Sequence, residues 1–161
     1  MPRKYYHLSY FETSIGRLGF VENGNAVTNV FFRSEKAPPN TKEHSTPLLR
    51  RAAQQIKEYL NGQRTAFDLP LKPEGTEFQQ TVWKALQTIS YGETRSYRDI
   101  AEQIGSPKAC RAVGRANHQN PITIIIPCHR VIGADGSLTG YGGGLKLKQQ
   151  LLNLEKLVII Q

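Results

Sequence analysis

A cysteine and a histidine stand side by side in the run Pro127-Cys128-His129-Arg130-Val131. A thiol is a strong nucleophile only as its thiolate, and a neighbouring imidazole is a common way to lower the pKa of a cysteine. The apolar run 122–126 comes just before the pair and predicts a buried strand, which would fix the pair away from bulk water. The alternative is that Cys128 is an inert buried thiol, the usual state of an intracellular cysteine.

The segment around this pair is basic. No acidic residue lies between Glu102 and Asp135, although that window holds four cations: Lys108, Arg111, Arg115 and Arg130. The whole chain of 161 residues has 21 Lys and Arg against 13 Asp and Glu, which gives a formal net charge of +8. This balance suits a polyanionic partner, although a solvated basic face without a partner would look the same.

Two short helices are predicted in and just before the basic segment. Ser96 caps a helix over 97–104 that Gly105 ends. Ser106-Pro107 then opens a second helix that runs to about Asn117. Two helices joined by a tight glycine-containing turn are the outline of a helix-turn-helix.

The second of these helices carries Arg111 among small residues, Ala112 and Gly114. Small side chains let a helix approach a groove of DNA closely, and one long cation can then enter the base stack. The same small residues also suit plain packing between helices, with Arg111 solvated. Both interpretations stay open at this point.

The remaining elements divide the chain into two domains. Strands are predicted over 5–11, 18–21 and 26–32, followed by a loop over 34–47 and a helix over 48–60. The prolines of 70–76 mark a linker between an N-terminal domain (1–69) and a C-terminal domain (77–161). We therefore predict an α+β fold: a small α/β domain with an antiparallel three-stranded sheet, then a mostly helical domain containing the helix-turn-helix.

Two further helices are expected in the C-terminal domain. Thr76 and Gln79 form a capping-box pattern before a helix whose Trp83 we assign to packing. A glycine-rich loop over 140–144 precedes a final helix over 145–154 that ends near Glu155. A carboxylate bonded to one imidazole nitrogen orients the ring and favours its protonated form, which gives Glu155 a possible use.

Composition narrows the cellular setting. Only two cysteines are present, Cys110 and Cys128, which argues against a disulfide framework and for a reducing compartment. No apolar run approaches transmembrane length, and the N-terminus has no apolar signal region. We expect a cytoplasmic protein, or a nuclear one in a eukaryote, with no membrane partner.

These motifs together resemble one family, the O6-alkylguanine-DNA alkyltransferases, also called methylated-DNA–protein-cysteine methyltransferases. The Pro-Cys-His-Arg-Val core is highly specific, and the resemblance covers nearly the whole chain from Gly75 onward. The matching segments appear in family order: 78–83, Tyr91-Gly92-Glu93-Thr94 with Ser96-Tyr97, Arg111-Ala112-Val113-Gly114, Asn120-Pro121, 126–133, 141–145 with Lys148, and Leu151-Leu152 with Glu155. The N-terminal third matches only in length and character.

The resemblance implies a role for each matching position. Cys128 would accept the alkyl group, His129 would withdraw its proton through a water, Glu155 would hold His129, and Asn120 would brace the turn. The residues that would bind the flipped base are Tyr97, Val131, Tyr141 and Gly142. The residues that would contact DNA are Lys108, Arg111, Ala112, Gly114 and Arg115. Because no cysteine precedes Cys110, we expect no metal site of the kind some relatives have, and no cofactor is implied.

The implied function is direct-reversal DNA repair by a monomer acting on double-stranded DNA. The alkyl group of O6-alkylguanine, with O4-alkylthymine as a further candidate, would pass irreversibly to Cys128 after base flipping through the minor groove. One alternative is a damage sensor that binds alkylated bases without transfer, but such proteins lack the acceptor cysteine. Another is a thiol hydrolase, which would leave the basic helix without a purpose.

Overall fold

The computed structural model describes residues 5–160, without the side chains of 158–160. The chain forms two compact units. Among the described residues, the first comprises 5–74 and 121–125, and the second comprises 75–120 and 126–160. The division at Glu74 falls inside the predicted linker, and the short segment 121–125 returns to the first unit. The predicted domain limits do not include that return.

The first unit is built on a four-stranded sheet in the order β3-β2-β1-β4. Its strands are β1 (Tyr6–Thr13), β2 (Gly16–Glu22), β3 (Val27–Phe32) and β4 (Thr41–Glu43). The first three form the antiparallel meander that the alternating pattern predicted. Strand β4 pairs parallel to β1 inside the predicted loop, so the prediction of three strands is one short. Its three residues are polar and largely exposed, and only backbone pairing reveals them as a strand.

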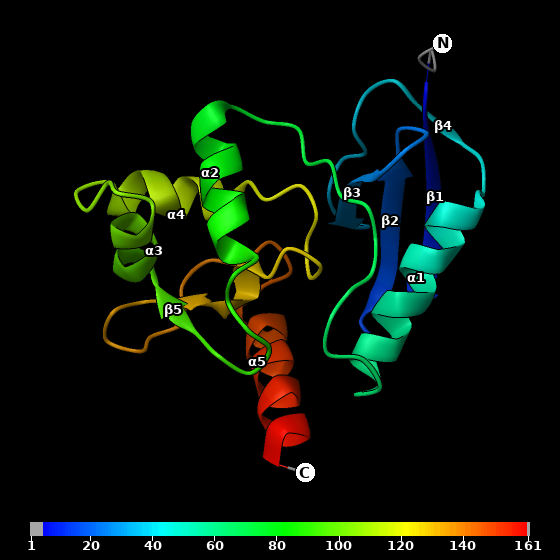
Figure 1. Ribbon diagram of the computed structural model, residues 1–161. Helices are drawn as coiled ribbons and strands as arrows, with labels where there is room; N and C mark the ends of the chain where they lie inside the picture. Colours follow the sequence, from blue (N-terminus) through cyan, green and yellow to red (C-terminus); the bar gives the residue numbers. More distant parts are fainter. Residues whose placement is uncertain (1–4, 161) are drawn as a thin grey trace. The chain divides into compact units, whose positions relative to one another are not determined.

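One helix, α1 (Pro47–Leu60), lies along a face of this sheet (Figure 1). It begins one residue before the predicted start, because Thr46 caps it and Pro47 takes the first helical position, which proline tolerates. Its apolar stripe buries Leu49, Ile56 and Tyr59 completely. The helical spacing therefore predicted both the element and its buried face.

The apolar run before Cys128 is a buried turn, so the predicted strand is wrong. Only Ile122 pairs with a strand, through a single parallel bridge to Val30. Ile124 has a φ of 71°, and the N–H of Ile125 donates to the carbonyl of Thr123 at 2.8 Å, which makes a strained γ-turn. The four isoleucines are buried all the same. A short apolar run thus predicted burial correctly but did not determine the backbone conformation.

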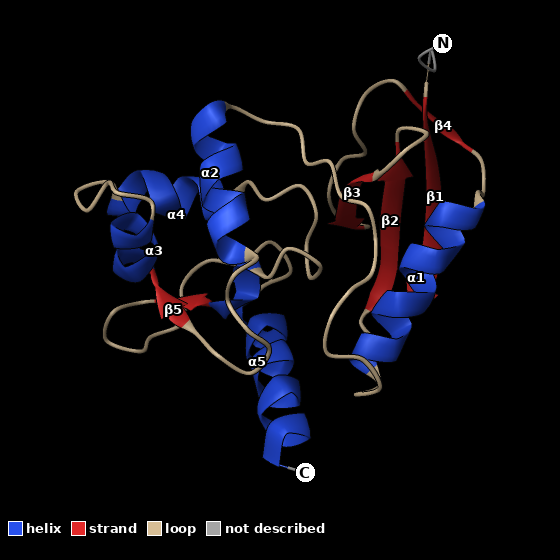
Figure 2. Ribbon diagram, in the orientation of Figure 1, coloured by secondary structure: helices blue, strands red, loops and turns tan. Residues whose placement is uncertain are grey.

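The second unit is mostly helical, and with the sheet of the first unit it confirms the α+β class (Figure 2). Its elements are α2 (Glu77–Leu86), β5 (Arg95–Ser96), α3 (Tyr97–Gln103), α4 (Cys110–His118), the 3₁₀ turn η1 (Cys128–Arg130), β6 (Val131–Ile132) and α5 (Leu145–Ile160). Helices α2, α3 and α4 pack against one another, while α5 packs against η1. Strands β5 and β6 pair in parallel, which joins the start of α3 to the residues after η1.

Local capping signals account for the starts of two helices. Thr76 and Gln79 form the predicted capping box at α2, and Ser96 caps α3 together with Asp99. Trp83 is buried, and its indole Nε1 donates to the carbonyl of Ala116 at 2.8 Å, which confirms its packing role. Helix α5 continues beyond the predicted end at Glu155 to Ile160.

Helix α4 begins at Cys110, three residues after the predicted first helical position at Pro107. The carbonyl of Ser106 accepts the N–H of Ala109 at 2.9 Å and closes a turn, so Ser106 does not cap the helix. The first helical bond of α4 runs instead from the N–H of Val113 to the carbonyl of Ala109. Lys108 therefore lies in the turn between α3 and α4. In the described part of the chain, no helix combines the length and the apolar character needed to cross a membrane.

Candidate active site

The backbone around Cys128 is fixed by two consecutive turns. Pro127 has φ −80° and ψ 63°, and the N–H of Cys128 donates across it to the carbonyl of Ile126 at 2.8 Å. This inverse γ-turn suits proline, whose ring already fixes φ near that value. Cys128 then opens η1, whose closing bond runs from the N–H of Val131 to the Cys128 carbonyl. The cysteine itself is only 6% exposed.

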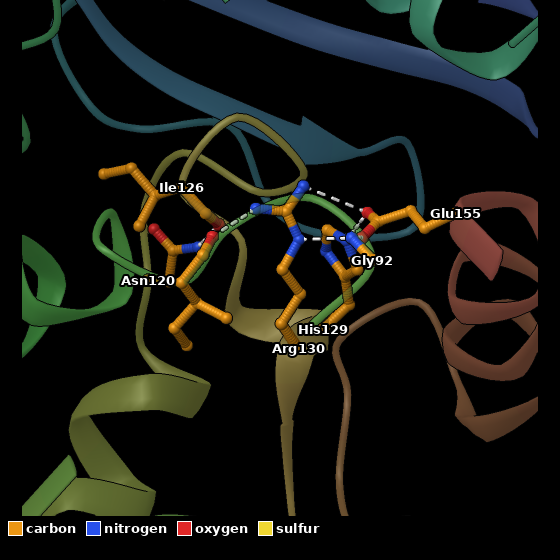
Figure 3. Close-up of polar contacts among 7 residues, drawn as sticks. Gly92, Asn120, Ile126, His129, Arg130 and Glu155 are labelled. Carbon is orange, nitrogen blue, oxygen red and sulfur yellow. Dashed lines mark hydrogen bonds and ion pairs between the residues drawn. The ribbon is translucent and has the colours of Figure 1, made fainter. Parts of the chain in front are cut away.

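Two asparagines hold this turn through its carbonyl groups. The amide of Asn120 donates to the carbonyl of Ile126 at 2.8 Å, as Figure 3 shows. The amide of Asn117, on α4, donates to the carbonyl of Cys128 at 3.4 Å. Sequence reasoning selected Asn120 but missed Asn117. A polar residue on the buried side of an amphipathic helix, three positions before Asn120, was the available signal.

Glu155 lies at the centre of a buried polar cluster. Its carboxylate oxygen Oε2 is 2.7 Å from His129 Nε2, and its Oε1 accepts the N–H of Gly92 at 2.9 Å (Figure 3). The guanidinium of Arg130 donates to both carboxylate oxygens, at 2.8 and 3.1 Å. His129 and Glu155 are at most 1% exposed. Helix α5 thus brings its carboxylate to the two residues that follow Cys128.

Arg130 does not lie on a basic face, contrary to its inclusion in the basic window. It is 7% exposed, and its third polar contact goes to the carbonyl of Ile89 at 2.6 Å. Its guanidinium carbon lies 5.7 Å from the centre of the Tyr91 ring, a cation–π distance. The charge pattern of the sequence could not separate an arginine that neutralises a buried carboxylate from one that faces solvent.

The electrostatics of the cluster keep His129 neutral. Burial itself raises the pKa of Glu155, but its hydrogen bond to His129 and the hydrogen bonds and positive charge of Arg130 outweigh burial and lower that pKa to about 2. Burial also lowers the pKa of His129, an effect that Glu155 opposes and that the charges of Arg130 and Lys148 reinforce. Glu155 does favour the protonated imidazole, as expected, but burial outweighs this effect and the pKa of His129 is lowered overall.

These protonation states fix the tautomer of His129. An ionised carboxylate can only accept hydrogen bonds, so the proton of a neutral His129 lies on Nε2, facing Glu155. The basic lone pair is then on Nδ1. The ring also meets the buried Tyr141 edge-on, with 6.4 Å between ring centres. The arrangement supplies an oriented neutral base beside a cysteine, which is the pairing that thiolate chemistry needs.

Two family models match almost the whole chain. The model described as 6-O-methylguanine DNA methyltransferase, DNA binding domain, matches residues 77–157. The model described as 6-O-methylguanine DNA methyltransferase, ribonuclease-like domain, matches residues 5–73. The chain belongs to the O6-methylguanine DNA methyltransferase family.

Curated relatives are similar to this chain over nearly their full length. It is 51% identical to the methylated-DNA–protein-cysteine methyltransferase of Mycobacterium tuberculosis H37Rv, covering 93% of this chain and 92% of the relative. It is 45% identical to the Haemophilus influenzae protein of that name, covering 99% and 90%. Its fold matches the crystal structure of M. tuberculosis OGT in complex with DNA with a TM-score of 0.88 and 49% identity, covering 94% of each chain.

Three of the five predicted DNA-contacting residues, Arg111, Gly114 and Arg115, line one hollow of about 500 Å³, whereas Lys108 and Ala112 do not. Its lining residues are Tyr97, Arg111, Gly114, Arg115, His118, Gln119 and Gly140. The hydroxyl of Tyr97 is 2.6 Å from Thr139 Oγ1, a contact that the sequence gave no reason to expect. Val131 and Tyr141 are buried near the active site, whereas Gly142 and Lys108 are exposed and outside the hollow lining.

Packing does not explain the glycine at position 114. A methyl group built there would meet only the Tyr97 ring, at 3.8 Å, which is an ordinary contact. The free protein therefore has room for a methyl group at position 114, so close packing between helices does not require a glycine there. Within the described residues, no group of three or more His, Cys, Asp or Glu side chains is placed to hold a metal ion.

Proposed function

We propose that this protein repairs DNA by direct reversal, transferring the alkyl group of O6-alkylguanine in duplex DNA to the sulfur of Cys128. The observation that carries the proposal is the rigid turn presenting Cys128 beside His129, whose tautomer is set by Glu155. Membership of the methyltransferase family and the DNA complex of the M. tuberculosis relative support the choice of substrate.

The chemistry follows from these groups. His129 Nδ1 accepts the thiol proton, directly or through a water, and passes it on to solvent. The thiolate of Cys128, now beside a neutral His129, attacks the alkyl carbon. A carbon–sulfur bond forms as the carbon–oxygen bond breaks, and the electron pair leaves on the guanine oxygen. A hydrogen-bond donor at the base, the role we assign to Tyr97, stabilises that departing charge. The thioether has no good leaving group, so each molecule reacts once.

Access requires the base to leave the duplex, because Cys128 is almost buried. We assign binding to the α3–turn–α4 segment, with Arg111 entering the vacated stack and Lys108, Ala112, Gly114 and Arg115 at the groove and backbone. The exposed guanidinium groups of Arg111 and Arg115 lie at the same hollow as Tyr97, which supports this assignment. Val131, Tyr141 and Gly142 line the pocket for the base in this scheme, Asn120 braces the turn, and the protein acts as a monomer.

Intact-protein mass spectrometry tests the proposal. Incubation with a duplex carrying O6-methylguanine should add one methyl group to the wild-type protein and to a Cys110→Ala variant. Cys128→Ala should gain nothing. Cys110 is the matched control because it is the other free cysteine and is more exposed. A parallel duplex with O4-methylthymine tests the second lesion. Binding of the O6-methylguanine duplex without mass gain would instead identify a damage sensor and overturn the proposal.

A further inference from the structure

Lys148 is a buried cation that the scheme above leaves without a purpose. It lies on α5 and is 0% exposed. Its Nζ donates to the carbonyl of Val131 at 2.6 Å and to the carbonyl of Thr139 at 2.9 Å. Carbonyl dipoles satisfy its hydrogen bonds but leave a full charge in a dry site, which is costly without an anion nearby.

The fold ties this ammonium to the turn that carries the nucleophile. Val131 receives Lys148 on its carbonyl, and its N–H closes η1 on the carbonyl of Cys128. The ammonium is therefore bonded to the residue that closes the cysteine's own turn. Burial lowers the pKa of Lys148, and the charge of Cys128 raises it in opposition, so the two groups interact electrostatically.

The nearby carboxylate is already neutralised by another cation. Glu155 is bound by Arg130 through two hydrogen bonds, and among the described residues Lys148 makes no ion pair with a carboxylate. The influence that raises the pKa of Lys148 against burial comes from the charge of Cys128. When Cys128 reacts as its thiolate and His129 is neutral, the buried charges balance: two cations, Arg130 and Lys148, and two anions, Glu155 and the thiolate.

We propose that Lys148 is the fixed counter-cation of the Cys128 thiolate, a positioning residue that stabilises the sulfur anion and disfavours a proton on His129. Both effects have the same sign, because one positive charge attracts the thiolate and repels an imidazolium. The inference rests on the proposed function, in which Cys128 reacts as its thiolate. Lys148 acts through the cysteine and does not touch the substrate.

The charged and titratable groups packed around the site set the direction of the effect. Helix α5 contributes Lys148 and Glu155, and η1 contributes Cys128, His129 and Arg130. Tyr91, from the segment after α2, has its pKa raised by burial and by Glu155 and stays neutral. The buried Tyr141 faces the His129 ring from the loop before α5. Removing the charge of Lys148 should therefore make the active site harder to deprotonate.

The test compares Lys148→Met and Lys148→Gln with Lys146→Met, all in a Cys110→Ala background. Lys146 is the matched control because it is an exposed lysine two residues away on the same helix. The rate of Cys128 methylation by the O6-methylguanine duplex is measured across pH. Both Lys148 variants should move the acidic midpoint of the profile up by about one pH unit, the lower end of the effect of a nearby opposite charge. Lys146→Met should keep the wild-type midpoint.

Lys148→Gln separates charge from hydrogen bonding, because glutamine keeps N–H donors but carries no charge. A wild-type midpoint in the folded glutamine variant would overturn the proposal. The affinity for undamaged duplex should be unchanged in both Lys148 variants, since a wholly buried lysine makes no phosphate contact. If the wild-type protein is not methylated, the proposed function itself fails; methylation with coinciding midpoints overturns only the role of Lys148.

A measurement on the wild-type protein tests the proposal even if the Lys148 variants do not fold. NMR of isotope-labelled lysine follows the titration of Lys148 before and after methylation of Cys128. Loss of the thiolate should lower the pKa of Lys148, because the opposing anion has gone while burial remains. An unchanged Lys148 titration after complete methylation would overturn the proposal.

Discussion

At the scale of single residues, the decisive group is Glu155, because it sets the states of its neighbours. Its carboxylate receives a guanidinium, an imidazole N–H and a backbone N–H, so it stays ionised although it is buried. Removing one partner from such a cluster leaves an uncompensated charge in the interior. The same residue therefore orients the base His129 and neutralises Arg130.

Replacement of Glu155 should change both stability and its pH dependence. Glu155→Gln should lower the free energy of unfolding at pH 7 by about 3 kcal/mol or more, because Arg130 remains buried without an anion. In the wild type the folded pKa of about 2 lies below the ordinary value of 4.5. On acidification the unfolded chain binds the proton first, so this contribution is complete above pH 4.5 and fades toward pH 2.

Urea unfolding at pH 6 and pH 3 measures this difference. The wild type should lose more stability between the two values than Glu155→Gln, by about 2 kcal/mol for a carboxylate depressed over that interval. Glu12→Gln serves as the control, since that carboxylate is exposed in an ion pair with Arg17. Equal losses in the wild type and in Glu155→Gln would contradict the depressed pKa of Glu155.

At the scale of elements, the sequence predicted the features that depend on neighbouring residues, but it did not predict those that depend on residues distant in the chain. The capping residues Thr76 and Ser96 act within three positions of themselves, so the sequence contains the whole interaction. Strand β4 exists only because β1 offers it an edge, and no pattern within its three residues shows this. The prediction of a strand before Cys128 was wrong for a related reason. An apolar run indicates that a segment is buried, but the γ-turn at Ile124 depends on tertiary packing.

The candidate site divides in the same way. The pair Cys128-His129 is visible because the two residues are adjacent. Glu155 was a candidate partner of the imidazole because of its carboxylate, and the family resemblance then assigned roles to Glu155 and Asn120. The N–H of Gly92, the amide of Asn117 and the ammonium of Lys148 contact partners that lie 11 to 63 positions away in the sequence, and several of these contacts involve backbone groups that carry no sequence signature. Arg130 was visible as a charge, but its buried partner was not.

Helix α4 offers a test that separates folding from DNA binding. Gly114→Ala should keep the stability of the free protein or raise it by up to about 1 kcal/mol, because alanine favours a helix and the added methyl fits. The same methyl should weaken duplex binding about tenfold, or about 1.4 kcal/mol, if the helix enters a groove. Thermal melts and fluorescence anisotropy provide the two readings.

Gly75→Ala is a control with the opposite expected result: it should change stability but not DNA binding by α4. Its methyl would overlap the Trp83 ring, so it should lower stability while leaving the helix surface unchanged. Wild-type duplex affinity in Gly114→Ala would show that α4 does not approach DNA closely at that residue. A loss of stability in Gly114→Ala would show that packing after all requires the glycine.

At the scale of the whole molecule, the proposed reaction changes the balance on which the folded state depends. Before transfer, the thiolate compensates Lys148 and the turn at Cys128 fits its surroundings closely. Transfer adds carbon at a residue that is 6% exposed and removes one of the two buried anions. Overpacking and an uncompensated cation both favour unfolding. The folded state of the methylated protein should therefore be less stable than that of the unmodified protein.

Thermal unfolding before and after stoichiometric reaction with O6-methylguanine duplex measures this cost on the isolated protein. Methylation should lower the midpoint by about 3 to 10 °C, from 1 to 3 kcal/mol of overpacking and lost charge balance in a domain of this size. The Lys148→Met variant separates the two causes, because it has no ammonium group that could lose its counter-charge. Methylation should lower its unfolding midpoint by less than in the wild type, and that decrease should report overpacking alone. Lys146→Met should show the wild-type drop. If methylation leaves the wild-type midpoint unchanged, the active site has room for the added carbon and the thiolate contributes nothing to the stability of the fold.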